Sequence, residues 1–400
     1  MNQRFYSLDV FRGATVAFMI LVNNPGTWSA IFGPLKHAPW HGCTPTDLVF
    51  PFFLFAVGNA IAFVLPKLEK MGQAAAVAKI VKRGVLIFLI GLLLNWFPFV
   101  RWEDGQLVGK SFHDLRIFGV LQRIALAYTF AALIIFFFKT RGAFYMAALL
   151  LLGYWVITAM AGDPADPYSL EGFWGTHLDR ALLGENHLYK GEGVAFDPEG
   201  LASTIPSIAQ VIFGFLVGDY IRMKGLGFGG KVSDGTSDTT RGDTGGLVAN
   251  LFVAGVVLWL AGMAWGLIFP INKKIWTSSY TLYTCGLATI VLATLIQLIE
   301  YRGWKGGWSR FFDVFGKNPL FIYVLSGLIP KSLALIRIPN GTNAEGEPKF
   351  TNPLGWFYEY VCKPISEKPE TGSLIYAVTF VVFLWAIAWW MNNKKIYVRV

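Results

Sequence analysis

Two histidines and a carboxylate lie close together near the start of this chain, at the edge of a long apolar run. His37 and His41 fall in the segment KHAPWHG, and Asp47 begins the apolar residues 47–66. Histidine exchanges a proton near neutral pH, so a histidine beside a carboxylate can act as a general base. Two simpler interpretations stay open, because a histidine can cap a loop and an aspartate can cap a helix.

Further ionisable and amide side chains lie inside or beside apolar runs elsewhere in the chain. If these runs cross a membrane, the side chains form two layers. Besides His37, His41 and Asp47, the outer layer holds Asn23, Gln122, Arg123, His187, Asp197 and Glu199. The inner layer holds Asp9, Arg12, Lys317 and Asn318. Ionisable groups inside a membrane are costly and often functional, so the pattern predicts a buried polar site that is reached from outside.

Several of these side chains also have structural interpretations. Arg123 lies within an apolar run and needs a partner or a ligand, and the partner could be Asp47, Asp114 or Asp197. Asp197 and Glu199 fall in FDPEG, where both could serve a turn. These residue types alone do not decide between structure and chemistry.

Ten apolar runs must position these side chains. A helix needs about 20 apolar residues to cross the hydrocarbon core of a membrane. The candidate runs are 8–25, 47–66, 80–98, 117–138, 142–161, 204–222, 248–269, 278–299, 318–336 and 373–392. We therefore predict an all-α polytopic membrane bundle of about ten (10–11) transmembrane helices, in one domain over residues 1–400. The first run is the least apolar, and its Asp9 and Arg12 could pair on one helix face.

The composition agrees with a membrane protein. Hydrophobic residues make up 54% of the chain and charged residues only 15%, whereas soluble proteins carry about 25% charged residues. The net charge of +9 does not indicate nucleic-acid binding, because the basic residues are spread between apolar runs rather than clustered. More than half of the 34 Lys and Arg residues fall in segments that are inside if the N-terminus is inside. Both termini are therefore predicted to be cytoplasmic.

The loops and cysteines add smaller predictions. Residues 225–246, rich in Gly, Ser, Thr and Asp, are predicted to be a flexible inner linker. Cys43 and Cys362 fall in predicted outer loops, where a disulfide between them is one alternative and free thiols are the other. The cysteine and histidine spacings predict no metal site.

Seven segments together resemble one family. They are SLDVFRG at 7–13, VN at 22–23, KHAPWHGCTPTDLVFPFFLF at 36–55, GVLQRIALAY at 119–128, DRALLGENHLY at 179–189, FDPEGLASTIPSIAQVIFGFLVGD at 196–219 and NPLFIYV at 318–324. In this order they resemble the heparan-α-glucosaminide N-acetyltransferase family of transmembrane acyltransferases. The resemblance covers most of the chain. The segments KHAPWHG, LLGENHLY and FDPEG are its specific parts.

The resemblance implies an activity. Members of this family transfer the acetyl group of cytoplasmic acetyl-CoA to an amino sugar on the far side of a membrane. The family's catalytic histidine matches His37, whereas His41 stands where the lysosomal enzyme has Asn and is expected to be dispensable. The chain is expected to lack that enzyme's long N-terminal luminal extension, so the acceptor stays open. The resemblance also implies a bacterial homologue in an inner membrane.

Residue roles follow from combining the resemblance with the two layers. We expect His37, Asp47 and Asn23 to serve catalysis, with Asn23 or Gln122 as oxyanion donors. The acceptor is expected to meet Gln122, Arg123, His187, Asp197 and Glu199. The phosphates of acetyl-CoA are expected near Asp9, Arg12, Lys317 and Asn318, with Lys82 and Arg83 as further cations.

Two questions stay open at this point. His37 can act as a base or accept the acetyl group itself. The expected partners are acetyl-CoA, an amino sugar or glycan and membrane lipids, without nucleic acid or metal, and a homodimer is compatible with the sequence. A sugar or small-molecule transporter is the alternative function, supported by the many spans and the polar midlayer, and a non-catalytic protein that binds an acyl chain or a sugar lipid is a third.

Overall fold

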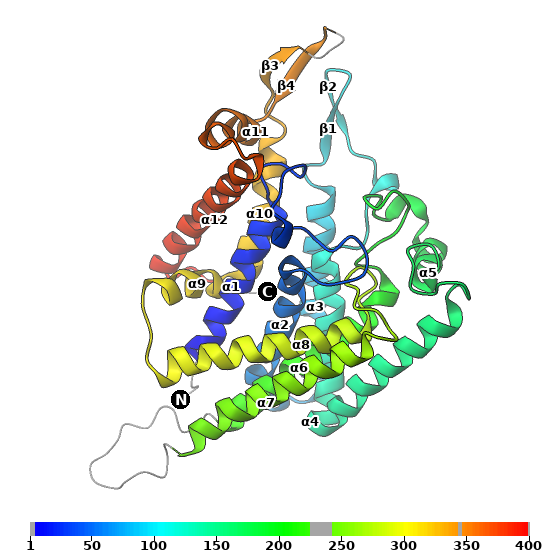
Figure 1. Ribbon diagram of the computed structural model, residues 1–400, viewed down its shortest axis with the longest axis vertical. Coiled ribbons are helices and arrows are strands. Elements are labelled where there is room, and N and C mark those ends of the chain that lie inside the picture. Colours follow the sequence, from blue (N-terminus) through cyan, green and yellow to red (C-terminus); the bar gives the residue numbers. More distant parts are fainter. Residues whose placement is uncertain (1–4, 225–241, 343–345, 399–400) are drawn as a thin grey trace.

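The computed structural model describes residues 5–224, 242–342 and 346–398, which fold mainly into helices (Figure 1). The α-helices are α1 (Tyr6–Asn23), α2 (Val49–Glu69), α3 (Gln73–Trp96), α4 (Val120–Ala161), α5 (Trp174–Leu183), α6 (Leu201–Lys224), α7 (Gly242–Trp265), α8 (Ser278–Ile296), α9 (Gly307–Lys317), α10 (Pro319–Leu333), α11 (Pro353–Phe357) and α12 (Pro369–Asn393). Short 3-10 and π turns connect them at η1 (Gly33–Leu35), η2 (Pro45–Leu48), η3 (Phe112–Asp114), η4 (Glu185–His187), η6 (Gln297–Tyr301), η7 (Tyr358–Cys362) and η8 (Lys363–Ile365). The strands are β1 (Val100–Glu103), β2 (Gln106–Gly109), β3 (Ile338–Thr342) and β4 (Pro348–Thr351).

The number of membrane-spanning helices differs from the prediction. Among the described residues, six helices are long and apolar enough to cross a membrane: α2 with the turn before it, α4, α6, α7, α8 and α12. A seventh is reached if α9 and α10, which meet at an angle of 82°, count as one span. About ten spanning helices are therefore not confirmed, although each of the ten predicted ranges falls largely on a helix. Charged side chains such as Lys82 and Arg83 make some of these helices less apolar than a simple span.

Helix α4 covers two predicted spans, 117–138 and 142–161, as two helical halves that meet at a kink. Its 42 residues at 1.5 Å each come to about 63 Å, roughly twice the hydrocarbon thickness of a membrane, so each half is long enough for one crossing. The backbone of Lys139 breaks the helical geometry, with φ 58° and ψ −173°. The helix turns near the bottom of the view in Figure 1, so its two halves point in different directions.

The centre of the bundle is the contact between α2 and α6. Two glycines let their backbones approach closely. A Cβ atom on Gly58 would lie 2.0 Å from the carbonyl oxygen of Val211, and one on Gly214 would lie 2.1 Å from that of Phe55. Small residues at such crossings are typical of helices that pack inside membranes.

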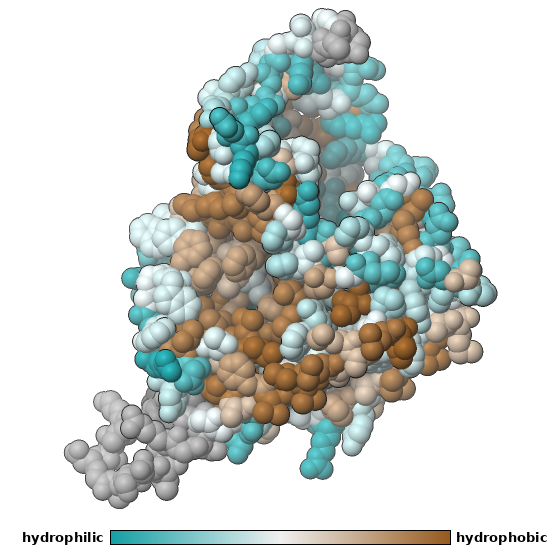
Figure 2. Space-filling model, in the orientation of Figure 1, coloured by the Kyte–Doolittle hydropathy of each residue, from teal (hydrophilic) through white to brown (hydrophobic). Residues whose placement is uncertain are grey.

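Apolar side chains also gather on the outside. Figure 2 shows a broad hydrophobic band over the visible face, crossed by α7 and α8, with hydrophilic residues at the top over the β-hairpins. Val253 and Val257 of α7, for example, are 63% and 60% exposed. An exposed apolar band of this kind is what a lipid-facing surface requires, and it agrees with an integral membrane protein.

Two β-hairpins modify the all-α prediction. Strands β1–β2 and β3–β4 each form an antiparallel pair, and both pairs project from the same end of the molecule (Figure 1). The guanidinium of Arg337 lies over the rings of Trp102, at 4.1 Å, and Phe350, at 5.0 Å. These contacts join the hairpins into one small outer structure, so the chain is helical apart from two small hairpins outside the bundle.

Two loop predictions have separate outcomes. Cys43 and Cys362 are free thiols, so the alternative of a disulfide between them is wrong. Of the predicted linker 225–246, residues 225–241 lie outside the described part, and Gly242 begins α7.

Candidate active site

Asp47 holds the loop between α1 and α2 in place through hydrogen bonds. Its side chain is 1% exposed, and one carboxylate oxygen, Oδ2, accepts hydrogen bonds from the backbone N–H of Ala38 and from the N–H and hydroxyl of Thr44, each at 3.0 Å. The Thr44 contacts form a capping box at the start of η2. The capping interpretation of Asp47 is therefore right, and it leaves the second oxygen, Oδ1, for another partner.

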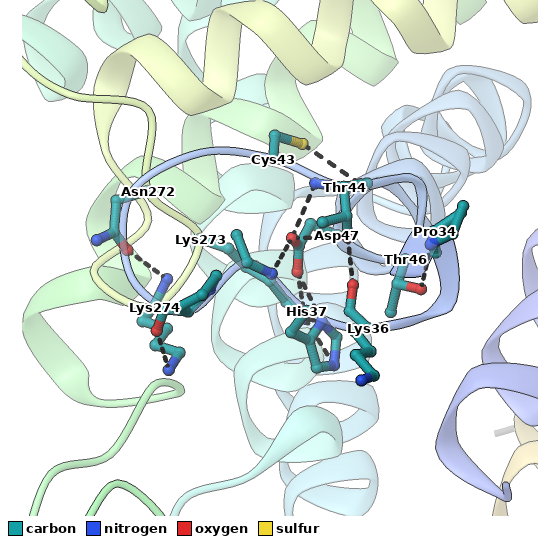
Figure 3. A network of polar contacts seen from close by, with 12 residues as sticks. Pro34, Lys36, His37, Cys43, Thr44, Thr46, Asp47, Asn272, Lys273 and Lys274 are labelled. Carbon is teal, nitrogen blue, oxygen red and sulfur yellow. Dashed lines mark hydrogen bonds and ion pairs between the residues drawn. The ribbon is translucent and has the colours of Figure 1, made fainter. Parts of the chain in front are cut away.

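That partner is His37. The Nδ1 atom of His37 lies 2.6 Å from Oδ1 of Asp47. A carboxylate can only accept, so Nδ1–H donates, and the lone pair of the imidazole is left on Nε2. Because the His37 side chain is 39% exposed while Asp47 is buried, the pair presents an oriented base at an accessible surface (Figure 3).

Lys273 completes this cluster, although its sequence position did not indicate it. Its Nζ atom lies 3.0 Å from Nδ1 and 3.4 Å from Nε2 of His37, and 3.5 Å from Oδ1 of Asp47. Figure 3 shows the three side chains pointing toward one another. Burial lowers the pKa of Lys273, and the carboxylates of Asp47 and Glu199 oppose that effect.

The loop between α7 and α8 carries Lys273 into the site by docking on the His37 loop. The backbone N–H of Gly42 donates to the carbonyl of Ile271 at 2.7 Å, and Gly42 and Asn272 form a parallel bridge. Gly42 adopts φ +109°, which a residue with a side chain rarely reaches. Lys274 adds a hydrogen bond from Nζ to the carbonyl of Pro39 at 2.7 Å. Two loops far apart in the sequence therefore form one wall of the site.

His41 belongs to this docking contact. The side-chain nitrogens of Asn272 and His41 lie 3.3 Å apart, and the ring of Trp40 packs edge-on against His41. Burial lowers the pKa of His41, partly opposed by Asp166. In the described part of the chain, His41 makes no hydrogen bond to Asp47, so the two histidines of KHAPWHG have different surroundings.

A second cluster surrounds Arg116, which sequence reasoning also missed. Its guanidinium donates to both carboxylate oxygens of Asp197, at 2.9 and 2.7 Å, and to Glu199 at 2.6 Å. Asp197 also accepts from the backbone N–H of Glu199 at 2.9 Å, so the turn interpretation holds as well. Burial raises the pKa of Glu199, but Arg116 outweighs it and the pKa is lowered overall. Burial lowers the pKa of Arg116, and the two carboxylates reverse that shift to a net increase.

Arg123 is fully buried, and its predicted ion pairs are absent. It donates to the hydroxyl of Ser203 and to the carbonyl of Gly200, the latter at 3.2 Å, and it lies 5.0 Å from the centre of the Trp276 ring. Within the described ranges, its Nε and Nη1 have no hydrogen-bond partner. Asp47 and Asp197 are paired with other groups, and Asp114 lies beside His113. Trp276 follows Lys273 by three residues, so the contact with Trp276 places Arg123 against the loop that carries Lys273.

Three other predicted residues lie apart from His37. Asn23 is exposed at the end of α1. Gln122 is buried and donates to the carbonyl of Ile117 at 2.9 Å, and Nδ1 of His187 lies 2.7 Å from the carbonyl oxygen of Leu115. In the part of the chain that the structure describes, neither Asn23 nor Gln122 forms a hydrogen bond to the His37–Asp47 pair.

The predicted inner layer consists of locally paired residues. Arg12 pairs with Asp9 at 2.5 Å, as the pairing interpretation predicts, and its Nε donates to the carbonyl of Gly316 at 3.0 Å. Lys317 pairs with Asp313 at 2.6 Å. Asn318 donates to the carbonyl of Ile396 at 2.9 Å and accepts from the N–H of Val398 at 2.8 Å. The layer therefore ties α1, α9 and the C-terminal segment together.

A cavity of about 110 Å³ opens beside this inner layer. Its walls come from α1, α2, α3, α4 and α10, and most of them are apolar. Arg12 and Arg83 are its cationic lining residues, and the guanidinium of Arg83 lies 4.9 Å from the ring centre of Tyr128. Among the described residues, no group of three or more His, Cys, Asp and Glu side chains is placed to hold a metal ion.

Comparisons with known proteins agree with the resemblance seen in the motifs. Residues 4–175 match the family described as heparan-alpha-glucosaminide N-acetyltransferase, catalytic. The heparan-alpha-glucosaminide N-acetyltransferase of Mus musculus is 27% identical, over 80% of this chain and 53% of that protein. The Homo sapiens protein of the same name is also 27% identical, over 80% of this chain and 52% of that protein. The chain spans about half the length of these curated relatives, and it is related in sequence to their family.

Proposed function

We propose that this chain, as a relative of the heparan-alpha-glucosaminide N-acetyltransferase family, is a transmembrane acetyltransferase. It moves the acetyl group of cytoplasmic acetyl-CoA to an amino group of a sugar or glycan on the outer side of the membrane. The observation that carries the proposal is the buried Asp47 carboxylate 2.6 Å from Nδ1 of the accessible His37. An imidazole oriented in this way is the base that acyl transfer to an amine requires.

The donor side of the proposal rests on the cavity beside α1. Acetyl-CoA has a polyanionic nucleotide, which needs cations at the inner face, and a thin arm, which fits between apolar walls. Arg12 and Arg83 supply cations at the cavity lining, and Lys317 and Asn318 lie on the adjoining elements. We infer that the arm runs along this cavity toward His37. This direction requires both termini to be cytoplasmic, as the distribution of basic residues predicts.

The acceptor side rests on the outer carboxylates. Asp197 and Glu199 are held by one guanidinium, that of Arg116, next to the loops that carry His37 and Lys273. Carboxylates bind the ammonium and hydroxyl groups of an amino sugar through charge-assisted hydrogen bonds. Gln122, Arg123 and His187 are proposed to shape the same region rather than to react.

The chemistry proceeds from Nε2 of His37, the ring nitrogen that Asp47 does not hold. The acceptor amine attacks the thioester carbonyl carbon, the carbon–sulfur bond breaks, and coenzyme A leaves as the thiol. His37 takes the proton from the amine and returns it to the thiolate, or it first accepts the acetyl group and passes it to the amine. Trapping of a labelled acetyl group on the protein in the absence of acceptor separates the two routes.

The decisive experiment uses the purified chain in detergent with labelled acetyl-CoA and glucosamine. We expect acetyl transfer by the unaltered protein. His37→Ala should abolish transfer while acetyl-CoA still binds, because the change removes the base and leaves the donor cavity intact. His41→Asn is the matched control and should keep most of the activity. Binding without any turnover would favour the transporter alternative, and a dead His41→Asn beside an active His37→Ala would reverse the two roles.

A further inference from the structure

An acyl transfer also needs a group that stabilises the oxyanion formed at the thioester carbonyl. Such donors often supply one of the largest catalytic effects in an acyltransferase. The sequence suggested Asn23 or Gln122 for this role. Asn23 is exposed at the end of α1, and the amide of Gln122 is bound to the carbonyl of Ile117. The donor must therefore come from another element.

Lys273 is the cationic donor beside the reacting nitrogen. Its Nζ atom is 3.4 Å from Nε2 of His37. The ammonium carries three N–H donors; Asp47, at 3.5 Å, faces one side of it, and the His37 ring nitrogens, at 3.0 and 3.4 Å, face a second. A carbonyl oxygen held next to Nε2 would lie within hydrogen-bond reach of the remaining donor.

The charge of Lys273 suits this role. The Lys273 side chain is 19% exposed, so its surroundings contain little water to screen the ammonium. Burial lowers the pKa of Lys273 overall, and Asp47 and Glu199 oppose part of that shift, so the two carboxylates support the charged form. A preorganised cation in such a place stabilises a developing negative charge far more than it would in bulk water.

Hydrogen bonds to the backbone of the neighbouring residues hold Lys273 in position. Asn272 Oδ1 accepts the N–H of Lys274 at 2.7 Å and that of Ile275 at 3.1 Å, and Gly42 fixes the loop against the His37 segment. Lys274 follows directly and has a different task, because its Nζ binds the carbonyl of Pro39 and the carboxylate of Glu192. Lys274 therefore anchors the loop, whereas Lys273 faces His37.

We propose that the ammonium of Lys273 is the oxyanion donor of the acetyl transfer, an inference that rests on the proposed function. When the nucleophile attacks the thioester carbonyl carbon, the carbonyl π electrons move to oxygen, and Lys273 donates a hydrogen bond to that oxyanion. The electrons return as the carbon–sulfur bond breaks. In direct transfer, His37 passes the proton of the amine to the coenzyme A thiolate; when His37 is the nucleophile, the thiolate leaves first and takes the proton that the amine releases when it attacks the acetyl-imidazolium. The role is the same whether the nucleophile is the amine or His37 itself.

Lys273→Met tests the inference, because it keeps the length of the side chain and removes the charge and its donors. We expect kcat to fall about 10²- to 10³-fold, as when one oxyanion donor is lost, with the dissociation constant of acetyl-CoA unchanged within about threefold. Lys273→Arg should restore most of the rate, since it keeps a cationic donor. Lys36→Met is the matched control, because it removes one charge from the exposed neighbour of His37 and should leave kcat unchanged.

The outcomes separate the inference from the proposed function. If the unaltered protein does not transfer acetyl groups from acetyl-CoA, the proposed function itself fails. If the unaltered protein is active and Lys273→Met keeps its kcat, the oxyanion role is wrong while the function stands. A Lys273→Met protein that loses acetyl-CoA binding together with activity, or a Lys273→Arg protein as slow as Lys273→Met, would assign Lys273 to structure and overturn the inference.

Discussion

The charged side chains of the inner and outer layers are held in two different ways. In the inner layer, Arg12 pairs with Asp9 three residues away, and Lys317 pairs with Asp313 four residues away, each within one helix. In the outer layer, Arg116 pairs with Asp197 across 81 residues of sequence. The inner pairs form with the helix itself, and the outer pair of His37 with Asp47 forms within one loop, whereas the contacts of Arg116 and Lys273 exist only when distant segments have docked.

Burial separates the two layers as well. The outer acids Asp47 and Asp197 have side chains that are 1% and 0% exposed, whereas the inner acids Asp9 and Asp313 are 10% and 7% exposed. The cations do not differ in this way, because Arg116 is 30% exposed and Arg12 is 27% exposed. A buried charge that loses its partner is costly, and a partly exposed one can turn to water. Changes in the outer layer should therefore have the larger effects.

The largest effect is expected for Asp47→Asn. The amide keeps the shape of the carboxylate but cannot accept the Nδ1–H of His37 with a negative charge, so the imidazole loses its orienting partner. We expect kcat to fall by about 10³-fold or more, with the affinity for acetyl-CoA retained. The measurement is acetyl transfer beside equilibrium binding of acetyl-CoA. Full activity of this variant would show that the pair seen in Figure 3 has no part in the reaction.

Arg116→Gln should be the most destabilising change in the acceptor cluster. It leaves Asp197 and Glu199 buried without their cation, which costs roughly 3 kcal/mol of unfolding free energy at neutral pH. A clear drop of the apparent melting temperature in detergent would agree with this. The exposed Arg101→Gln is the control, because its ion pair with Glu103 lies at the surface of a hairpin. Equal stability of both variants would contradict the contrast between buried and exposed pairs.

Asp179→Asn should stabilise the protein, and more so at higher pH. Burial raises the pKa of Asp179 from 3.8 to about 7, with Asp197 adding to the shift. The unfolded chain releases this proton near pH 4 and the folded chain near pH 7, so the carboxyl makes the folded state less stable as the pH rises between these values. The asparagine oxygen can still accept the N–H of Leu201, which now binds Asp179 at 3.0 Å. The gain should reach roughly 4 kcal/mol at pH 8 for a three-unit shift.

The check is the melting temperature of both proteins at pH 5 and pH 8. A gain for Asp179→Asn that is larger at pH 8 than at pH 5 supports the buried neutral carboxyl. A gain that is the same at both pH values would contradict it, because an exposed carboxyl is ionised in both states.

The smallest effect on stability is expected in the inner layer, from Arg12→Gln combined with Lys317→Gln. Local pairs of this kind contribute about 0.5 kcal/mol each, and the hydrogen bond from Arg12 Nε to the carbonyl of Gly316, which joins α1 to α9, adds about 1 kcal/mol, so the melting temperature should fall only slightly. If these cations meet the phosphates of acetyl-CoA, its affinity should fall about tenfold, equivalent to 1.4 kcal/mol. Lys368→Gln, an exposed lysine before α12, is the control with unchanged affinity. Unchanged affinity in the double variant would move the nucleotide toward Lys82 and Arg83.

The parts of the site that sequence analysis could predict are those set by local patterns. KHAPWHG and TPTDL are adjacent, so a contact between His37 and Asp47 follows from one short loop. Lys273 and Arg116 each come from other segments, 236 and 81 residues away from their partners. The one local signal for Lys273 was a pair of lysines in a loop predicted to be outside, where positive charge is otherwise sparse.

The sequence by itself determined that this chain forms apolar helices, and it identified the loop that pairs His37 with Asp47 together with the family the chain resembles. Helix formation, capping and hydrophobicity depend on neighbours within a few residues, so they can be seen in the order of amino acids. Only the tertiary structure decided that Arg116 holds two carboxylates and that Lys273 lies beside the histidine. These arrangements depend on segments that dock across 81 and 236 residues of sequence, and the buried charges in them are tolerated only because their partners arrive from another segment.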